Sequence, residues 1–237
     1  MSINLQRYEL FKDMSIESFE LLSNQGHCNH NYLVIAQNKK YLIREFKLEN
    51  DRKSEFNIQK KIAKKKIGAS PLLLDEKNGL IIAHYLEGKH QTKLTQQMLK
   101  KMAKLLKRLH SIKIRQKRNS FKNNFKFKDK KVKKAFVILE KERKQYALGH
   151  NDLHPQNILF YNREIKLIDW EYARFSDIYF DLVSIIIEYK LNPKDTQIFL
   201  RSYFLKEPIN GKKIKAFTII YKELWRLWFE KLAKGEL

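Results

Sequence analysis

The stretch His150-Asn151-Asp152-Leu153-His154-Pro155-Gln156-Asn157 decides how this chain is interpreted, together with Leu167-Ile168-Asp169-Trp170-Glu171 shortly after it. Asp152 precedes Asn157 by five positions, and Asp169 follows an apolar run. This spacing is typical of phosphoryl-transfer sites, in which an aspartate accepts the proton of an attacking hydroxyl. Asparagine and a second aspartate supply the hard oxygen ligands that Mg2+ prefers. The pattern predicts Asp152 as the catalytic base and Asn157 and Asp169 as metal ligands.

The segment between these motifs predicts a hairpin. Residues 157–161 and 164–168 have the pattern of two strands around a turn at Asn162-Arg163. Because a hairpin returns the chain to its start, Asn157 and Asp169 can face one ion although they lie twelve positions apart. The alternative is a surface turn with two ordinary acids, and the complete set of motif residues favours the catalytic interpretation.

Length and composition are those of a globular protein. The 237 residues, 43% of them hydrophobic, can bury a substantial core, and we expect two lobes, 1–86 and 87–237. No run is long enough to span a membrane, so we expect no membrane insertion. The first residues lack the apolar stretch of a signal peptide, and Cys28 has no second cysteine to pair with. We therefore expect a cytoplasmic protein.

Positive charge is concentrated in one segment. The net charge is +23, and residues 100–144 hold nineteen Lys or Arg against three acids, a net of +16. Such a block can bind nucleic acid or an anionic membrane. Lys outnumbers Arg there and no recognition motif accompanies it, so a solvated face is favoured and no specific nucleic-acid partner is expected. Residues 150–189 have three basic residues against seven acids, which suits Mg2+ and a cationic substrate.

Periodicity predicts an α+β fold with a small antiparallel sheet first and helices afterwards. A helix at 51–67, with Gly68 as its terminator, should lie between the third and fourth strands. Residues 112–128 show no period and are expected to form a loop. The five strands are expected at 19–23, 32–36, 41–46, 72–74 and 80–83, and the later helices at 95–110, 129–145, 178–189, from Asn192-Pro193 onward, and at 212–233.

The first lobe also contains residues suited to hold ATP. Arg44 stands on the strand that carries the phosphate-binding lysine in kinases, and Glu55, at the start of the next helix, is its expected partner. An ordinary surface pair is the alternative, and the downstream motif favours the functional interpretation. The loop at 23–31 has one glycine and no G-x-G-x-x-G, but its backbone N–H groups could still bind phosphate, with Gly26 and Asn29 as the candidate residues.

Taken together, these motifs resemble the choline and ethanolamine kinases, within the aminoglycoside phosphotransferase-like group that has a protein-kinase-like fold. The resemblance covers nearly the whole chain. It rests on Asn29 to Val34, Arg44, Arg52-x-x-Glu55, His150 to Asn157, Ile168 to Ala173, Phe180-Asp181-Leu182 and the W-x-x-W pair Trp225 and Trp228.

The resemblance implies a two-lobed protein, with nucleotide in the N-terminal lobe and catalysis and substrate binding in the mainly helical C-terminal lobe. It implies ATP and Mg2+ as cofactors, Asp152 as the base, and the backbone near His84 and Leu86 as the adenine contact. Gln25 and Cys28 depart from the family pattern, in which glycine and threonine are common. The segment between His110 and His150 is also short for the family.

The acceptor is expected to be a small cationic alcohol. Phe180-Asp181-Leu182 begins a helix only eleven residues after Asp169, which leaves no room for the long activation segment of a protein kinase. A quaternary ammonium needs aromatic faces and a carboxylate, and the candidates are Glu171, Tyr172, Trp225 and Trp228. The alternative for the two tryptophans is a helix packing its aromatic face into the core.

Other functions stay open at this point. Thiamine, a cationic alcohol with an aromatic ring, is the closest alternative substrate to choline and ethanolamine. An aminoglycoside is less favoured, because residues 192–237 hold five acids against ten Lys or Arg. A different class is an inactive kinase fold that binds RNA or an anionic membrane through residues 100–144.

Overall fold

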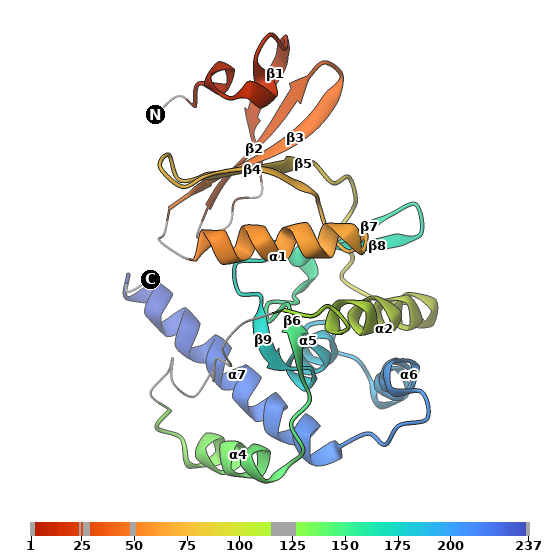
Figure 1. The fold of residues 1–237 in the computed structure, drawn as a ribbon. Coiled ribbons are helices and arrows are strands. Elements are labelled where there is room, and N and C mark those ends of the chain that lie inside the picture. The colour runs from red at the N-terminus through yellow and green to blue at the C-terminus, as the bar shows by residue number, and fades with distance from the viewer. Residues whose placement is uncertain (1–2, 24, 26–28, 48–50, 115–126, 236–237) are drawn as a thin grey trace. The chain divides into compact units, whose positions relative to one another are not determined.

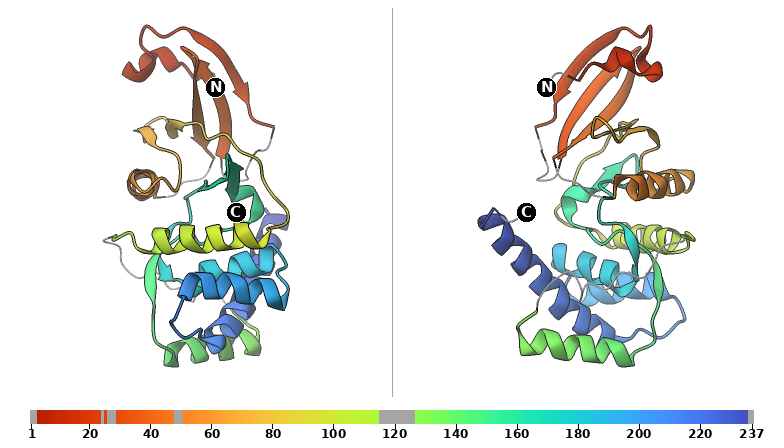
Figure 2. Two further views of the ribbon diagram at one scale, coloured as in Figure 1. Left: turned by 90° about the vertical axis from the view of Figure 1, so that its right-hand side faces the viewer. Right: turned by 60° about the vertical axis from the view of Figure 1, so that its left-hand side comes forward.

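The computed structural model describes residues 3–23, 25, 29–47, 51–114 and 127–235. The chain forms two compact units, Met1–Glu87 and Gly88–Leu237, and each is described by itself. Figure 1 labels the elements of both units, and Figure 2 shows them from two further sides. Among the described residues no helix is both long and apolar enough to cross a membrane.

The first unit is built on a five-stranded antiparallel sheet, as predicted. Its spatial order is β1-β2-β3-β5-β4, so the hairpins β1–β2–β3 and β4–β5 meet where β3 pairs with β5 (Figure 1). Four of the five strands begin earlier than predicted, because pairing with neighbours extends them, and β5 begins at Leu80 as predicted. Their bounds are β1 Ile16–Leu21, β2 Asn29–Ala36, β3 Lys39–Phe46, β4 Pro71–Asp75 and β5 Leu80–His84.

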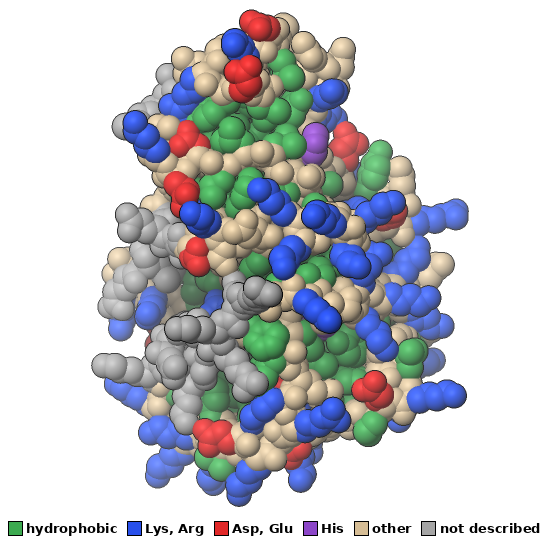
Figure 3. All heavy atoms as spheres, viewed as in Figure 1, with side chains coloured by type: hydrophobic (Ala, Val, Ile, Leu, Met, Phe, Trp, Pro, Cys, Tyr) green, Lys and Arg blue, Asp and Glu red, His purple; other side chains and the backbone are tan. Residues whose placement is uncertain are grey.

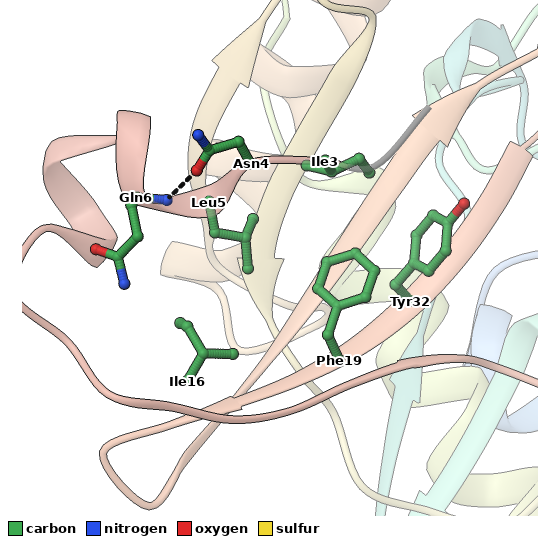
Figure 4. Close-up of a pocket in the computed structure, with 7 residues that line it drawn as sticks. All are labelled: Ile3, Asn4, Leu5, Gln6, Ile16, Phe19 and Tyr32. Atoms are coloured by element: carbon green, nitrogen blue, oxygen red, sulfur yellow. Dashed lines mark hydrogen bonds between the residues drawn. The ribbon is translucent and has the colours of Figure 1, made fainter.

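Two short 3-10 helices, which the periodicity did not predict, pack on this sheet. They are η1 (Leu5–Arg7) and η2 (Glu9–Phe11), and Phe11 is fully buried with an edge-on contact to Tyr41. Beside η1 lies a pocket of about 380 Å³, bounded on the strand side by Phe19 and Tyr32 (Figure 4). Elements of three residues are too short to show a period, which is why the sequence pattern missed them.

Helix α1 spans Arg52–Lys64, inside the predicted range. Asp51 caps it by accepting a hydrogen bond from the Ser54 N–H at 2.9 Å. The predicted terminator, Gly68, is wrong. The chain leaves the helix at Lys66, which adopts a left-handed conformation with φ 56°, so the turn is complete before the glycine is reached.

The second unit is mainly helical, with two short antiparallel ribbons. Helix α2 packs against α6, and both α4 and α5 pack against the long α7 (Figure 1). The ribbons pair β6 with β9 and β7 with β8. The bounds are α2 Gln96–His110, α4 Lys130–Lys141, β6 Tyr146–Gly149, η3 Pro155–Asn157, β7 Ile158–Tyr161, β8 Glu164–Leu167, β9 Arg174–Asp177, α5 Tyr179–Glu188, α6 Pro193–Phe204 and α7 Gly211–Ala233.

Most helices of this unit were predicted to within a few residues, and their caps explain the boundaries. The hydroxyl of Thr95 accepts from the Met98 N–H, and the side chain of Asn192 accepts from the Asp195 N–H. Of the predicted loop at 112–128, residues 115–126 lie outside the described part of the chain.

The predicted helix at 129–145 is too long. It ends at Lys141, because Glu142 turns to an extended conformation and the Gln145 N–H donates to Asp177. The chain then enters β6, whose partner β9 begins 25 residues after β6 ends. A strand of four residues with so distant a partner gives no local signal, so both β6 and β9 were missed.

Candidate active site

The backbone of the catalytic loop is held by one buried carboxylate. Asp181, in the first turn of α5, is only 1% exposed and accepts hydrogen bonds from the backbone N–H groups of His150 and Asn151, both at 2.8 Å. A third donor is His110, whose Nε2 lies 3.1 Å from the same carboxylate. Burial alone would raise the pKa of Asp181, but the hydrogen bonds and nearby imidazoles outweigh it and hold the pKa below its usual value.

Asn151 gives the loop its sharp bend just before the predicted base. Its φ is 65°, a left-handed conformation that asparagine tolerates well. Its side-chain amide donates to the carbonyls of Gly149 and Tyr172, and its oxygen accepts from the Ser176 hydroxyl at 2.7 Å. A Cβ at Gly149 would collide with that hydroxyl, so only glycine fits there. The bend is thus braced by β6 and β9 together.

One of the two carboxylate oxygens of Asp152 contacts neighbouring side chains. Its Oδ2 accepts from the Asn157 amide nitrogen at 2.8 Å and lies 3.6 Å from Nε2 of His154. Within the described part of the chain, Oδ1 has no hydrogen-bond donor from the protein. That oxygen can therefore accept the proton of a hydroxyl, which is the chemistry expected of a general base.

The two predicted metal ligands are joined by the hairpin. Ile158 pairs with Leu167 in the β7–β8 ribbon, and the Ile168 N–H donates to the Asn157 carbonyl at 3.0 Å. Asp169 follows directly, with φ 64°. Since the Asn157 amide nitrogen faces Asp152, its oxygen points to the opposite side and is available to a cation. An amide oxygen and a carboxylate fit Mg2+ well.

The hairpin itself confirms the predicted turn. Asn162 and Arg163 have φ values of 45° and 64°, as a two-residue turn with both central residues left-handed requires. In the described residues no group of three or more His, Cys, Asp or Glu could hold a metal ion by itself. A Mg2+ ion at Asn157 and Asp169 would therefore need further oxygen ligands, of the kind that nucleotide phosphates provide.

An aromatic cluster at the C-terminal end of α7 lies next to the catalytic loop. Trp225 contacts the His154 ring edge-on, with centroids 6.2 Å apart, and His154 in turn lies beside Asp152. Trp225 also contacts Trp228, at 5.6 Å and 75°. Both tryptophans are half-buried. The predicted base and both predicted tryptophans thus belong to one contiguous group of side chains.

His154 and Glu188 join this group without having been predicted. His154 has a raised pKa: burial lowers it, but the hydrogen bond and charge of Asp152 outweigh burial. Glu188, at the end of α5, accepts a hydrogen bond from Tyr221 at 2.9 Å, and Tyr221 contacts Trp225. The sequence signal for His154 was its place between two motif residues. Glu188 had none, because only the packing of α5 on α7 brings it here.

The two other predicted substrate residues occupy the turn between β8 and β9. Glu171 and Tyr172 are both half-buried. The Tyr172 carbonyl accepts from the side chains of Asn151 and Arg174, so the backbone of this turn is tied to the catalytic loop. A direct role of either side chain in substrate binding stays a prediction.

Helix α7 is fixed at its N-terminal end by a buried ion pair. The ammonium of Lys213 lies 2.6 Å from the Asp177 carboxylate and 4.3 Å from the centre of the Tyr179 ring. It also donates to the Arg143 carbonyl at 3.1 Å. A fully buried ammonium needs such partners to offset the lost hydration. The pair connects the helix that carries the tryptophans to the strand that braces the catalytic loop.

In the first unit, the predicted pair of Arg44 and Glu55 is present and buried. The guanidinium lies 2.6 Å from the carboxylate, which is 2% exposed. A second arginine, Arg52, binds the other oxygen of Glu55 at 2.8 Å and also donates to Asn29, at 3.2 Å. Gln59 donates to Glu55 as well. The predicted residue Asn29 is therefore part of the same network.

Arg52 was part of the motif, but its contacts could not be derived from the sequence. Its guanidinium also lies over the Phe46 ring at 4.1 Å, and Phe46 is the cross-strand partner of Asn29. The remaining nucleotide-binding predictions are untested. His84 ends β5 with an exposed side chain stacked on Tyr41, Leu86 is half-buried, and Gly26 lies outside the described residues.

A small sheet unit with a buried arginine–glutamate pair, followed by a helical unit with this catalytic loop, defines the class of kinase-like phosphotransferases. Comparison with known families agrees. The phosphotransferase enzyme family matches residues 22–211, and the chain belongs to this family.

Individual relatives are similar to this chain over different lengths. A LicA homolog of Metamycoplasma hominis is 31% identical to this chain over 153 residues. The matched region covers 59% of this chain and only 61% of that relative's length. The crystal structure of choline kinase LicA from Streptococcus pneumoniae superposes with a TM-score of 0.76 at 21% identity, covering 98% of this chain and 90% of the other. LicA in complex with AMP gives 0.71 at 22% identity, covering 95% and 87%. These structures confirm the predicted protein-kinase-like fold.

Proposed function

We propose that this protein phosphorylates the hydroxyl of choline or a related amino alcohol, using ATP and Mg2+. The single observation that carries the proposal is the contiguity of Asp152, His154 and Trp225. It places an aromatic surface suited to a cationic head next to a carboxylate suited to a hydroxyl. The relatives named LicA, one of them described as a choline kinase, support the same substrate class.

In this proposal Asp152 accepts the proton of the acceptor hydroxyl through Oδ1, the carboxylate oxygen without a protein donor among the described residues. The hydrogen bond from Asn157 to Oδ2 holds the carboxylate in one orientation. A hydroxyl held in line with the transferred phosphate gains most of its reactivity from that positioning.

The nucleotide is assigned to Met1–Glu87, the part of the chain that holds Arg44 and Glu55. Arg44 would bind the phosphates, with its direction set by Glu55. His84 and Leu86 would contact the adenine, and the loop with Gly26 the phosphates. The LicA complex with AMP supports a nucleotide site in this fold. Bound at Asn157 and Asp169, Mg2+ would neutralise charge on the phosphates.

Acceptor binding is assigned to Gly88–Leu237. Trp225 and Trp228 offer aromatic faces, and Glu188 adds negative charge next to them through Tyr221. Glu171 and Tyr172 would add charge and polarity from the turn between β8 and β9. A desolvated cation over such a face gains on the order of 2 kcal/mol. Thiamine satisfies the same chemistry and is the alternative substrate. The single cysteine in the sequence favours a cytoplasmic location.

Steady-state kinetics with a panel of alcohols would test this function. Choline and ethanolamine are expected to give the highest kcat/KM, with thiamine and an aminoglycoside as competitors. Trp225→Leu and Trp228→Leu should each raise the acceptor KM by about tenfold with little change in the KM for ATP. Ile219→Ala is the control, since Ile219 is on the same helix and exposed.

Three results would contradict the proposal in different ways. A preference for thiamine would be compatible with the proposed phosphoryl transfer but would refute choline or a related amino alcohol as the acceptor. Tryptophan variants that change stability alone would place the cation elsewhere. Absence of ATP turnover with every alcohol, combined with salt-sensitive RNA binding, would favour the inactive-kinase alternative.

A further inference from the structure

The positive charge of the chain is unevenly divided between its two units. Met1–Glu87 carries fourteen Lys or Arg and eleven Asp or Glu, whereas Gly88–Leu237 carries 35 and 15. The second unit therefore accounts for +20 of the net +23. A lysine bias spread over the whole sequence would charge both units alike. The difference points to a local cause within the second unit.

Helix α4 presents much of this charge on one face. Its buried residues, Val132 and Ala135, face α7, the helix against which it packs. Its exposed side chains include five lysines and a single acid, Glu140. Lysine and arginine side chains line the lower edge of the molecule in Figure 3, where Figure 1 places α4. The five lysines are Lys130, Lys131, Lys133, Lys134 and Lys141.

Some lysines elsewhere on the surface form ion pairs with acids. Lys40 forms an ion pair with Glu87 and Lys166 with Glu164. Within the ranges that the structure describes, none of the five lysines of α4 has an acidic partner. Their charge is thus not neutralised by direct ion pairs within the described residues, and a cluster of such lysines attracts an anionic partner.

Two aliphatic side chains lie among the lysines. Val137 is 50% exposed and Ile138 is 39% exposed. At 100° per residue, Lys130, Lys134 and Lys141 form one row along the helix, and Val137 and Ile138 fall on either side of it. Exposed aliphatic residues beside a basic row are typical of helices that lie on a membrane surface.

We propose that α4 docks on an anionic lipid bilayer, lying parallel to its surface. The lysine row would contact the anionic headgroups, and Val137 and Ile138 would reach the boundary with the acyl chains. In this arrangement α4 does not cross the bilayer. RNA is the less suitable partner, because the exposed side chains of α4 include no arginine and no aromatic ring, the groups that stack on bases.

Cosedimentation with vesicles tests the proposal directly. The full chain should bind vesicles of about 70% phosphatidylcholine and about 30% phosphatidylglycerol. It should not bind vesicles of pure phosphatidylcholine, and high salt should abolish the binding. Removing Lys130, Lys134 and Lys141 together by substitution with Gln should weaken partitioning about a hundredfold, at roughly fivefold per lysine. The matched control substitutes Lys53, Lys64 and Lys65, three exposed lysines of α1 and its end, in the same way.

A second variant separates the lipid surface from a general polyanion. Val137→Gln with Ile138→Gln should weaken vesicle binding about tenfold and leave the binding of single-stranded RNA unchanged. Thermal unfolding of each variant checks that the fold is intact. The proposal is overturned if the wild type ignores anionic vesicles, if the α1 control loses as much binding as the α4 variant, or if the aliphatic variant binds vesicles like the wild type.

Discussion

The two units use a buried carboxylate in different ways. In the first unit the donors to Glu55 within the described residues are all side chains, those of Arg44, Arg52 and Gln59. In the second, Asp181 receives two backbone N–H groups and one imidazole. A carboxylate that binds side chains sets the direction of a cation, whereas one that binds the backbone sets the path of the chain. Changes at Glu55 should therefore affect ligand binding, and changes at Asp181 the fold.

The carboxylate proposed as the catalytic base should show the largest effect. Asp152→Asn removes the proposed proton acceptor and leaves the shape of the loop, so kcat should fall by about a hundredfold to ten-thousandfold. Nucleotide affinity, measured by titration, should stay close to that of the wild type. Glu164→Gln, at an exposed position on the neighbouring hairpin, is the control. Near-normal turnover of Asp152→Asn would exclude this residue as the base.

Asp181→Asn tests the backbone anchor. An amide offers one acceptor oxygen where the carboxylate offers two, so one N–H of the loop loses its partner, and the free energy of unfolding should fall by about 2–4 kcal/mol. Because its pKa is lowered in the fold, Asp181 stabilises the protein above its ordinary pKa, and this contribution is lost as the pH falls through the folded value. The variant should therefore show a flatter acid limb when unfolding is followed against pH.

A loss of turnover in Asp181→Asn without any loss of stability would contradict the distinction between the two carboxylates. It would mean that Asp181 acts on the chemistry rather than on the path of the chain.

The side-chain network of the first unit should behave as one element. Arg44→Ala and Glu55→Ala should each raise the KM for ATP by about tenfold to a hundredfold, since each removes a charged hydrogen bond. The double variant should raise the KM for ATP no more than either single variant does, because the loss of one partner already abolishes the action of the pair. The KM for the acceptor should not change. Additive losses would show that the two residues act independently.

The smallest effect expected is a pH dependence of acceptor binding. Because the pKa of His154 is raised from its ordinary value of 6.5, the imidazolium persists to a higher pH than usual. A positive charge beside Trp225 disfavours a cationic acceptor, so its KM should rise a few-fold as the pH falls through this range. His154→Gln should remove the dependence. The KM for ATP serves as the internal reference, and an equal rise in both constants would count against His154 as the cause.

Much of this arrangement could be predicted from local sequence. The hairpin from Asn157 to Asp169 follows from two short strands and a turn, and α7 follows from its period. The pairs that depend on distant segments could not be predicted: β6 with β9, Asp181 with the catalytic loop, and Glu188 with Tyr221. In each of these, the partners lie more than 20 residues apart and only packing brings them together.

A small tilt of helix α7 about its N-terminal end would displace the residues near its C-terminal end. Lys213, held by Asp177 at one end, lies twelve residues before Trp225, a distance of about 18 Å along the axis at 1.5 Å per residue. A tilt of about 5° at the ion pair would move the tryptophan by about 1.5 Å, enough to misplace a bound substrate. If the proposed acceptor binds at Trp225, its affinity should therefore depend on the Lys213–Asp177 salt bridge at the other end of the helix.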